Sequence, residues 1–245
     1  MSQIDMDKKD LFTLAIDASG QYCSAAITKG WTLAGEQVVS GTKNHSELIL
    51  LIIDELVNST GIALSDIDLV AVTKGPGSFT GLRTGISTAQ GLAFSLDKIL
   101  VGVSTLEALV FQSGIDSGYV CPMIDARKKQ VYTGLYKVSG RNVVNKEKDD
   151  TVISPEEWLA ELPEQVSFIG DGAGTYHGII EGYPEHNFRV FPEYMGIIRA
   201  GAVAFSSLRS YLNYQRNDLE SIVPEYIRPP DAVVGKKRKN LLNRP

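Results

Sequence analysis

The stretch KGPGSFTGLRTGISTAQGLAFSL, residues 74–96, decides the fold of this chain. It follows the apolar run IDLVAVT at residues 67–73, whose β-branched content and length predict a buried strand. Ser78 or Thr80 is placed to cap a helix that begins near Gly81. The sequence therefore predicts a strand, a glycine-rich turn and a helix in succession.

The glycine-rich turn is a candidate phosphate site. Gly75 and Gly77 free the backbone for positive φ or close approach, and N–H groups at the start of a helix bind phosphate readily. A Walker loop would place a Lys-Ser or Lys-Thr pair where this chain has Leu82 and Arg83. The turn is therefore either a phosphate site of another kind or a plain connection.

Small residues recur at every fourth position along the helix that follows. Gly81, Gly85, Ala89 and Ala93 share one face, because residues four apart are neighbours on a helix. A face with almost no side chains lets another element approach closely. That element is either the chain's own sheet or a helix of another molecule, and this helix alone does not decide between them.

Residues 44–60 predict a second helix, capped by Asn44 or Ser46 and ended by Gly61. Its apolar residues occupy more of the circumference than one sheet can cover, so we expect a further helix to cover the rest. They are Leu48, Ile49, Leu50, Leu51, Ile52, Ile53, Leu56 and Val57. We expect His45 to cap this helix or to contact a partner rather than to bind a metal.

The two predicted helices together form a candidate partner interface, with the small-residue face setting the distance of approach. The residues assigned to this interface are His45, Leu48, Ile49, Ile52, Ile53, Leu56, Gly81, Gly85, Ala89 and Ala93.

The order of predicted elements repeats along the chain. Three strands, a helix, a strand and a helix occur twice, and the sequence IDAS at residues 16–19 is echoed by IDAR at residues 124–127. This duplicated βββαβα order predicts an α/β fold with two similar lobes that face each other across a cleft.

The repeat also suggests domain limits. We expect an N-terminal lobe in residues 1–113, a C-terminal lobe in residues 114–233 and a flexible basic tail in residues 234–245. The last predicted helix, residues 196–214, is a candidate to pack back on the first lobe.

Composition limits the classes of function. The formal net charge is −5 and the pI is near 5.3, which argues against a chain that holds nucleic acid alone. No apolar run approaches the ~20 residues of a membrane span, and the first ten residues are too polar for a signal peptide. Cys23 and Cys121 lie in apolar, strand-like runs, which favours buried reduced thiols. We expect a cytoplasmic protein without a metal site, because its three histidines lack the spacing of ligands.

Asp17 and Asp125 are each expected at the carboxyl end of the first strand of a lobe. Open α/β sheets place their ligands at such strand ends. The alternative is that each aspartate caps a turn and that the second glycine-rich stretch, residues 169–174, is a plain connection. The candidate nucleotide or phosphate residues are Asp17, Ser19, Gly75, Gly77, Asp125, Gly170 and Gly172.

The segment KGPGSFTGLRTGISTAQGLAF, residues 74–94, resembles the signature of the TsaB family of tRNA threonylcarbamoyladenosine biosynthesis proteins, bacterial relatives of the catalytic subunit TsaD. The resemblance covers most of the chain and implies the two-lobed plan of the actin, Hsp70 and sugar-kinase superfamily. The further similar segments are LAIDAS at residues 14–19, HSELILLIIDEL at 45–56, GVSTLEAL at 102–109 and PMIDARKKQVYTGLY at 122–136.

The resemblance also implies that the metal site of the catalytic relative has been lost in this chain. The catalytic relative carries histidines at the positions that match Thr105 and Leu109, an i, i+4 pair that binds iron or zinc. Both histidines are replaced here, and a leucine cannot coordinate a metal. The resemblance therefore implies a non-catalytic subunit required to form N6-threonylcarbamoyladenosine at position 37 of tRNA.

Partners follow from the same resemblance. The chain would dock on TsaD through the predicted helix pair, the ATPase TsaE would join the assembly, and tRNA would be reached only through the complex. We expect no cofactor beyond a weak or shared contact with ATP or ADP. When TsaD is absent, we expect a homodimer through the same self-complementary surface.

An enzyme of another class is the alternative, namely an ATP-dependent phosphotransferase of the sugar-kinase type that uses Asp17 and Asp125. A protease is disfavoured, because the chain has neither a zinc motif nor a Gly-x-Ser-x-Gly elbow. Two basic clusters, residues 127–129 and 236–239, are typical of solvated charge.

Overall fold

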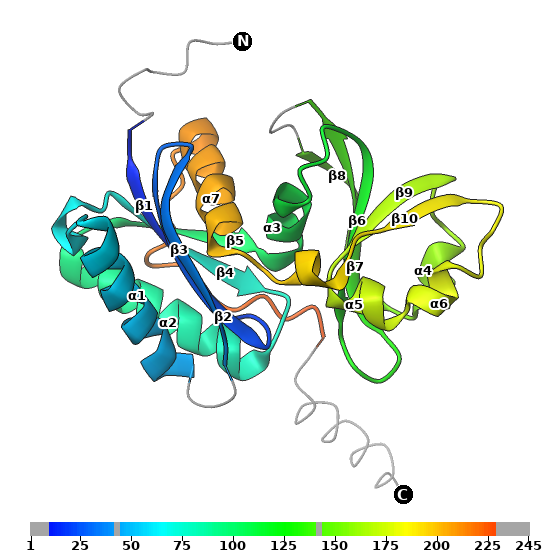
Figure 1. Ribbon diagram of the computed structural model, residues 1–245, viewed down its shortest axis with the longest axis horizontal. Coiled ribbons are helices and arrows are strands. Elements are labelled where there is room, and N and C mark those ends of the chain that lie inside the picture. The colour runs from blue at the N-terminus through cyan, green and yellow to red at the C-terminus, as the bar shows by residue number, and fades with distance from the viewer. Residues whose placement is uncertain (1–9, 42–44, 141–143, 229–245) are drawn as a thin grey trace, which may run out of the picture.

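The computed structural model describes residues 10–41, 45–140 and 144–228. They form two lobes, each built on a five-stranded sheet (Figure 1). The strand orders are β3-β2-β1-β4-β5 and β8-β7-β6-β9-β10, so corresponding strands of the two lobes occupy corresponding places. The predicted duplicated α/β fold is confirmed. The tail predicted at residues 234–245 lies outside the described residues.

In the first sheet, β1, β2 and β3 are antiparallel neighbours, whereas β4 and β5 continue the sheet parallel to β1. The strands are β1 (Phe12–Asp17), β2 (Tyr22–Lys29), β3 (Thr32–Ser40), β4 (Leu69–Gly75) and β5 (Ile99–Ser104). The helical elements between and after them are α1 (His45–Thr60), η2 (Leu64–Asp66), α2 (Phe79–Leu96) and α3 (Thr105–Gln112).

The second sheet repeats this pattern, with β6, β7 and β8 antiparallel and with β9 and β10 parallel to β6. Its strands are β6 (Ser117–Asp125), β7 (Val131–Ser139), β8 (Val144–Ile153), β9 (Gln165–Ile169) and β10 (Asn187–Val190). The helical elements of the second half are α4 (Pro155–Leu159), α5 (Asp171–Thr175), α6 (His177–Ile180), η3 (Glu193–Gly196) and α7 (Ala200–Tyr214).

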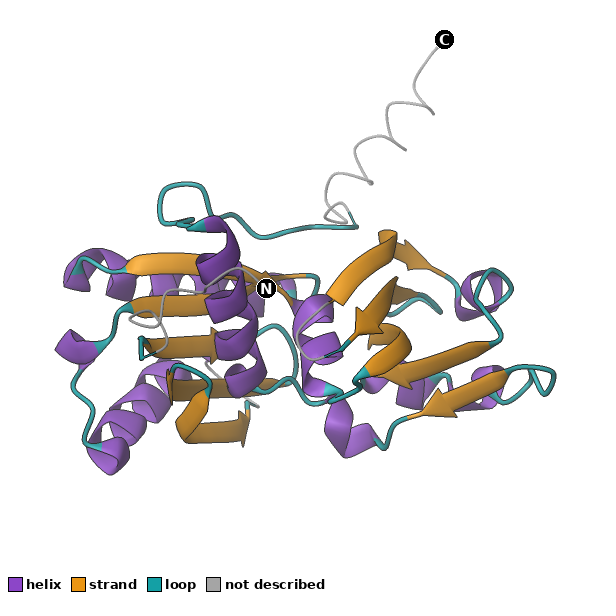
Figure 2. Ribbon diagram, turned by 90° about the horizontal axis from the view of Figure 1, so that it is seen from above, coloured by secondary structure: helices purple, strands orange, loops and turns teal. Residues whose placement is uncertain are grey.

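The first sheet is covered on both faces, because side chains alternate along each strand. Leu14 and Ile16 belong to the core beneath α1 and α2. Ala15 and Ala71 point to the other face, where their small side chains pack against α7. Helix α7 thus comes from the second half of the sequence and packs on the first lobe (Figures 1 and 2).

Boundaries of several helices differ from the predictions for local reasons. Helix α2 begins at Phe79 rather than near Gly81, because Ser78 is the cap and its hydroxyl accepts a hydrogen bond from the N–H of Gly81. The helix predicted from residue 196 begins at Ala200, because η3 ends at Gly196 and an extended segment follows it.

Candidate functional site

Asp17, at the carboxyl end of β1, is held by its own lobe. One oxygen, Oδ1, accepts hydrogen bonds from the N–H of Ser19 (3.2 Å), the hydroxyl of Ser19 (2.7 Å) and the hydroxyl of Thr73 (2.6 Å). The residue is 2% exposed. Burial raises the pKa of this carboxyl, while the Ser19 and Thr73 hydrogen bonds and the nearby His45 oppose the rise. Asp17 therefore closes a turn and ties β1 to β4.

Asp125 occupies the matching place at the end of β6. Its Oδ1 accepts a hydrogen bond from the N–H of Arg127 (2.9 Å), and its Oδ2 forms an ion pair with the Arg127 guanidinium (3.1 Å). The N–H of Asp125 donates to Asp171 Oδ1 (3.0 Å), and burial raises the pKa of Asp171. Each lobe therefore ends its first strand in a turn closed by an aspartate, as the alternative interpretation of these residues predicts.

A cleft of about 480 Å³ lies beside these turns. Three carboxylates line it, and none of its described lining residues is Lys or Arg. The described lining residues therefore offer a phosphate group no cationic side chain. The lining residues are Asp17, Ser19, Gly20, Gln21, Tyr22, Ile124, Asp171, Glu193, Tyr194, Gly196, Ile197 and Ile198. The structure thus brings together only Asp17 and Ser19 of the predicted nucleotide residues.

Gly75 and Gly77 do not line this cleft. A Cβ on Gly77 would collide with the carbonyl oxygen of Ser19, and one on Gly75 would lie 2.5 Å from the carbonyl oxygen of Glu225. The N–H of Ser78 donates to the same Ser19 oxygen (2.7 Å). These glycines permit close backbone packing, and their assignment to a phosphate site stays a prediction.

The second glycine-rich turn behaves in the same way. Gly170 has a φ of 123°, and a Cβ there would collide with the carbonyl oxygen of Met123. A Cβ on Gly172 would lie 2.9 Å from backbone atoms of Met123 and Ile124. Both glycines therefore allow α5 to pack directly on β6, and neither lines the cleft.

The lobes also meet through an apolar cluster. Leu106 and Leu109 of α3 pack with Tyr136 of β7, and Val120, Val138 and Ile169 complete the contact from the second lobe. Thr105 and Leu109 are both fully buried. Among the described residues, no group of three or more His, Cys, Asp or Glu side chains is arranged to hold a metal ion.

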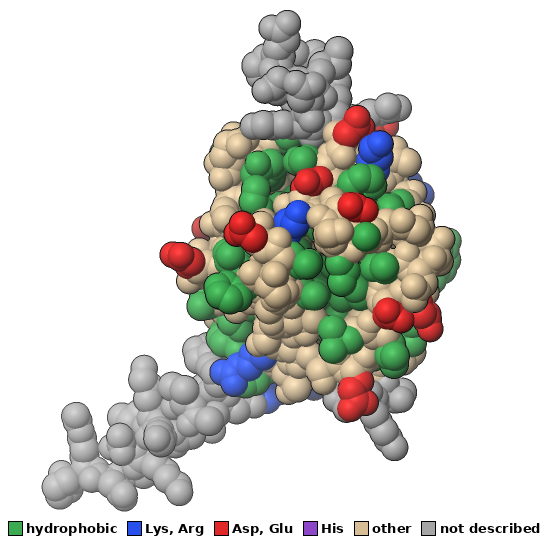
Figure 3. Space-filling view, turned by 90° about the vertical axis from the view of Figure 1, so that its left-hand side faces the viewer, with side chains coloured by type: hydrophobic (Ala, Val, Ile, Leu, Met, Phe, Trp, Pro, Cys, Tyr) green, Lys and Arg blue, Asp and Glu red, His purple; other side chains and the backbone are tan. Residues whose placement is uncertain are grey.

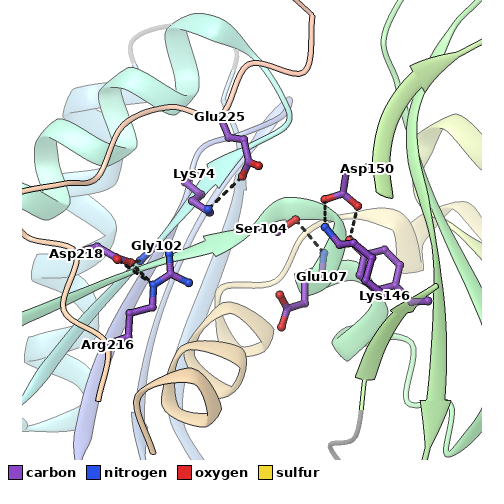
Figure 4. Close-up of polar contacts among 10 residues, drawn as sticks. Lys74, Gly102, Ser104, Glu107, Lys146, Asp150, Arg216, Asp218 and Glu225 are labelled. Atoms are coloured by element: carbon purple, nitrogen blue, oxygen red, sulfur yellow. Dashed lines mark hydrogen bonds and ion pairs between the residues drawn. The ribbon is translucent and has the colours of Figure 1, made fainter. Parts of the chain in front are cut away.

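Polar residues border this apolar contact, as Figure 4 shows. The hydroxyl of Tyr136 donates to Asp150 Oδ1 (2.6 Å), and Lys146 pairs with Asp150 Oδ2 (2.8 Å). Burial, reinforced by the Asp150 carboxylate, raises the pKa of Tyr136. On the first lobe, Lys74 pairs with Glu225 (3.2 Å) (Figure 4). The charges near the lobe contact are therefore paired within their own lobes.

The small-residue face of α2 is turned inward. Gly81, Gly85, Ala89 and Ala93 are all buried, and the last two belong to the core of the first lobe. A Cβ on Gly81 would collide with the carbonyl oxygen of Ala18, at the end of β1. The prediction that these residues set the approach distance of a partner is wrong for this fold, because the chain's own sheet already occupies that face.

The apolar stripe of α1 is turned inward too. Ile49, Ile52, Ile53 and Leu56 belong to the same core, and Leu48 packs against it while half-buried. Their assignment to an intermolecular surface is corrected for the same reason. The ring of His45 lies against Gly41, and its Nε2 is buried without a hydrogen-bond partner among the residues that the structure describes.

The outward side of the helix pair carries other residues. Leu50, Leu51 and Phe94 are 54%, 61% and 81% exposed. On α2 the outward positions between the two ends include Ser87 and Gly91, which are small. Figure 3 views the side of the molecule on which α1 and α2 lie and shows hydrophobic side chains gathered near its centre, with Asp and Glu around them.

The sequence contained a signal for this surface. Ile49, Ile52, Ile53 and Leu56 have the i, i+3, i+4, i+7 spacing of a core stripe, so Leu50 and Leu51 must lie outside it. Phe94 and the cleft residues Asp171, Glu193 and Tyr194 were not singled out from the sequence.

Among the described residues, no helix has the length and apolar character needed to cross a membrane.

The model of the TsaD family, tRNA N6-adenosine threonylcarbamoyltransferase, matches residues 37–236. The chain is 31% identical over 222 residues to the tRNA threonylcarbamoyladenosine biosynthesis protein TsaB of Bacillus subtilis (strain 168), which covers 89% of this chain and 95% of the relative. It is 32% identical over 164 residues to the TsaB of Escherichia coli (strain K12), covering 65% of this chain and 71% of the relative.

A solved structure shares the fold. The crystal structure of an uncharacterized Pseudomonas aeruginosa protein, described as similar to peptidase YEAZ, superimposes with a TM-score of 0.76 at 25% sequence identity. The match covers 89% of this chain and all of the other.

Proposed function

The chain belongs to the TsaB family of tRNA threonylcarbamoyladenosine biosynthesis proteins, and on this premise we propose that it is a non-catalytic subunit that docks on the transferase TsaD. In this role it organises and activates the catalytic subunit without performing the transfer. The ATPase TsaE joins the assembly, and tRNA is reached through the complex in the cytoplasm. The outward surface of α1 and α2 carries this proposal.

That surface has the composition of a docking site. We define the α1–α2 patch as Leu50, Leu51, Ser87, Gly91 and Phe94. Leu50, Leu51 and Phe94 expose apolar side chains to water, which is unfavourable. A partner surface that covered them would remove this free-energy cost. Ser87 and Gly91 let a second helix come close to α2 between them. A specific interface centred here would bury about 1,600 Å² in total.

The partners of the two aspartates that end β1 and β6 support the non-catalytic role. Asp17 already accepts three hydrogen bonds within its own lobe, and Asp125 is paired with Arg127. The cleft beside them has carboxylates but no described Lys or Arg to receive a nucleotide's phosphates. A phosphotransferase that uses the two aspartates is therefore not favoured.

The same patch explains the expected homodimer. An exposed apolar patch on one chain can be covered by the same patch on a second copy, which is the commonest symmetric arrangement of dimers. TsaD and the second copy then compete for one surface. The isolated chain should bind tRNA weakly, because its net charge is −5.

The test replaces exposed patch residues with a charge. Leu51→Glu and Phe94→Glu should each weaken binding to TsaD about 30-fold or more, because a central apolar contact is worth about 2 kcal/mol or more. Sedimentation of mixtures measures the complex, and formation of the modified nucleoside on tRNA measures activation. Tyr214→Glu, at an equally exposed aromatic residue on α7, is the matched control.

If both patch variants bind and activate TsaD as the unsubstituted chain does, the α1–α2 patch is not the docking surface. If the purified chain alone modifies tRNA or transfers phosphate from ATP, the non-catalytic role is wrong.

A further inference from the structure

The cleft of about 480 Å³ is built by both halves of the chain. The first lobe contributes the turn after β1, from Asp17 to Tyr22, and the second contributes Ile124 and Asp171. The rest comes from residues 193–198, on the segment that passes from the second lobe to α7 (Figure 1). The volume lies within the range of about 300–1,000 Å³ that is usual for sites of small molecules, and a ligand there would contact both lobes.

The segment at residues 193–198 is fixed from behind by one glutamine. Gln112, at the end of α3, donates from Nε2 to the carbonyls of Met195 (2.6 Å) and Ile197 (2.7 Å). Its Oε1 accepts a hydrogen bond from the N–H of Arg199 (2.8 Å). This wall of the cleft is therefore formed before any ligand arrives, so a ligand would not have to order it.

The polar side of the cleft is acidic. Asp17, Asp171 and Glu193 line it, and none of its described lining residues is Lys or Arg. Asp17 is 2% exposed, and its Oδ1 accepts the hydrogen bonds from Ser19 and Thr73. No described residue donates a hydrogen bond to its other oxygen, Oδ2. A buried carboxylate oxygen without a donor is unfavourable, so the cleft favours a ligand that supplies hydrogen-bond donors.

The remaining lining is aromatic and aliphatic. Tyr22 is half-buried and Tyr194 is 72% exposed, and Ile124, Ile197 and Ile198 are half-buried between them in exposure. The face of an aromatic ring attracts cations, and aliphatic side chains pack against methylene groups. The lining as a whole therefore suits a molecule that combines positive charge with an apolar body.

We propose that this cleft binds an organic polycation, namely an alkylamine that carries two or more ammonium groups. The ammonium groups donate hydrogen bonds to the carboxylates, and the methylene groups between them pack against the isoleucines. None of the lining residues lies on α1 or α2, so this site is separate from the α1–α2 patch.

Other ligands fit the lining less well. A metal ion needs several ligand side chains in a compact group, and among the described residues no group of three or more His, Cys, Asp or Glu is arranged in this way. A nucleotide would bring its phosphates to a cleft whose charged lining residues are acidic. A neutral nucleoside would leave the charge of the carboxylates without a partner.

The experiment titrates the isolated full chain with spermidine at physiological salt and measures the dissociation constant, Kd, by isothermal titration calorimetry. Asp17→Asn removes the buried charge and should raise Kd about tenfold or more, because hydrogen bonds to charged groups are the strong ones. Glu193→Gln, at an exposed carboxylate, should raise Kd about 2- to 5-fold. Tyr194→Leu keeps an apolar side chain without the ring and should also raise Kd about 2- to 5-fold.

Glu164→Gln is the matched control, because Glu164 is an exposed carboxylate of the same lobe outside the cleft. Its Kd should equal that of the unsubstituted chain. Circular dichroism shows whether each variant is folded, and the two exposed positions, Glu193 and Tyr194, test the site even if Asp17→Asn does not fold.

The inference is overturned if spermidine shows no saturable binding, or if the cleft variants bind it as tightly as the control does. Titrations with Mg²⁺, adenosine and ATP test the class of ligand. If Mg²⁺ binds as tightly as spermidine with the same dependence on the variants, the cleft recognises charge alone and the assignment to an alkylamine is wrong. It is wrong as well if adenosine or ATP binds more tightly than spermidine. The isolated chain is used throughout, so these outcomes leave docking on TsaD to its own test.

Discussion

The turn after β1 and the turn after β6 begin in the same way and end differently. In both, an aspartate that ends the strand accepts a hydrogen bond from the N–H two residues later, at 3.2 Å from Ser19 to Asp17 and at 2.9 Å from Arg127 to Asp125. Beyond that point the first turn is enclosed, with Ser19 3% exposed, whereas Arg127 extends into solvent. The duplicated fold repeats the start of the turn but not its surroundings.

The helices that follow explain the difference. In the first lobe, the long helix α2 starts beside the turn, and Gly77 and Gly81 bring its backbone against Ser19 and Ala18. In the second lobe, the corresponding helix α5 has only five residues and leaves the turn uncovered. One lobe thus uses the turn to fasten a helix whose outer surface is proposed to dock a partner, and the other presents the turn itself.

The enclosed turn should be the more sensitive to added atoms. Gly81→Ala places a methyl group against the carbonyl of Ala18, with backbone on both sides, so we expect the free energy of unfolding to fall by about 3 kcal/mol or more. Urea denaturation followed by circular dichroism measures the change.

Gly91 on the same helix supplies the control. It is exposed, and a Cβ there meets nothing within 4 Å, so Gly91→Ala should raise the free energy of unfolding by about 0.5–1 kcal/mol. If Gly81→Ala and Gly91→Ala changed the free energy of unfolding equally, the close contact between α2 and the turn after β1 would be refuted.

Substitutions in the exposed turn after β6 should change the free energy of unfolding in the opposite direction. There Lys128 and Lys129 adopt the left-handed conformation, with φ angles of 57° and 58°. A residue with a Cβ lowers the stability of the folded state by roughly 1–2 kcal/mol when it adopts the left-handed conformation. Glycine avoids this strain, but it lowers stability by roughly 0.5–1 kcal/mol because it has more conformational freedom in the unfolded chain. Lys128→Gly with Lys129→Gly should therefore raise the free energy of unfolding by about 1–2 kcal/mol in total. Differential scanning calorimetry would register a higher Tm, and a clear fall in Tm would mean that the lysine side chains stabilise the turn more than its backbone strains it.

The smallest expected effect concerns the aspartate of the enclosed turn and depends on pH. Burial raises the pKa of Asp17 above its ordinary value of 3.8, so the folded state disfavours the ionised form. The contribution of Asp17 to stability is therefore greatest below pH 3.8 and is lost as the pH rises through the raised pKa. Asp17→Asn keeps an oxygen that can accept the Ser19 and Thr73 hydrogen bonds and cannot ionise.

The stability of Asp17→Asn relative to the unsubstituted chain should thus increase from pH 4 towards neutral pH and then level off. Urea midpoints measured across this range test the expectation. Asp97→Asn, at the exposed left-handed cap of α2, controls for the loss of one negative charge. A relative stability of Asp17→Asn that falls with rising pH would reverse the sign argued here.

Local patterns in the sequence were sufficient for the elements and for their order. The β-branched run at residues 67–73, the Ser78 cap and the small residues of α2 act over a few residues, so they can be read without the rest of the chain. The echo of Asp17 in Asp125 was enough to predict two similar lobes. The resemblance at residues 74–94 was enough to predict the family.

The sequence by itself thus determined that α2 has a face that another element approaches closely and that two aspartates end equivalent strands. Only the tertiary structure decided that this face meets β1 and β4 of the same chain, that both aspartates close turns, and that Arg228 donates a hydrogen bond to the carbonyl of Ala126 in the turn after β6, 102 residues earlier in the sequence. The physical reason is that close packing and hydrogen bonding do not depend on where a partner lies in the sequence. The chemistry of a side chain determines which groups it can bind. Only the fold determines which of those groups lie close enough to bind.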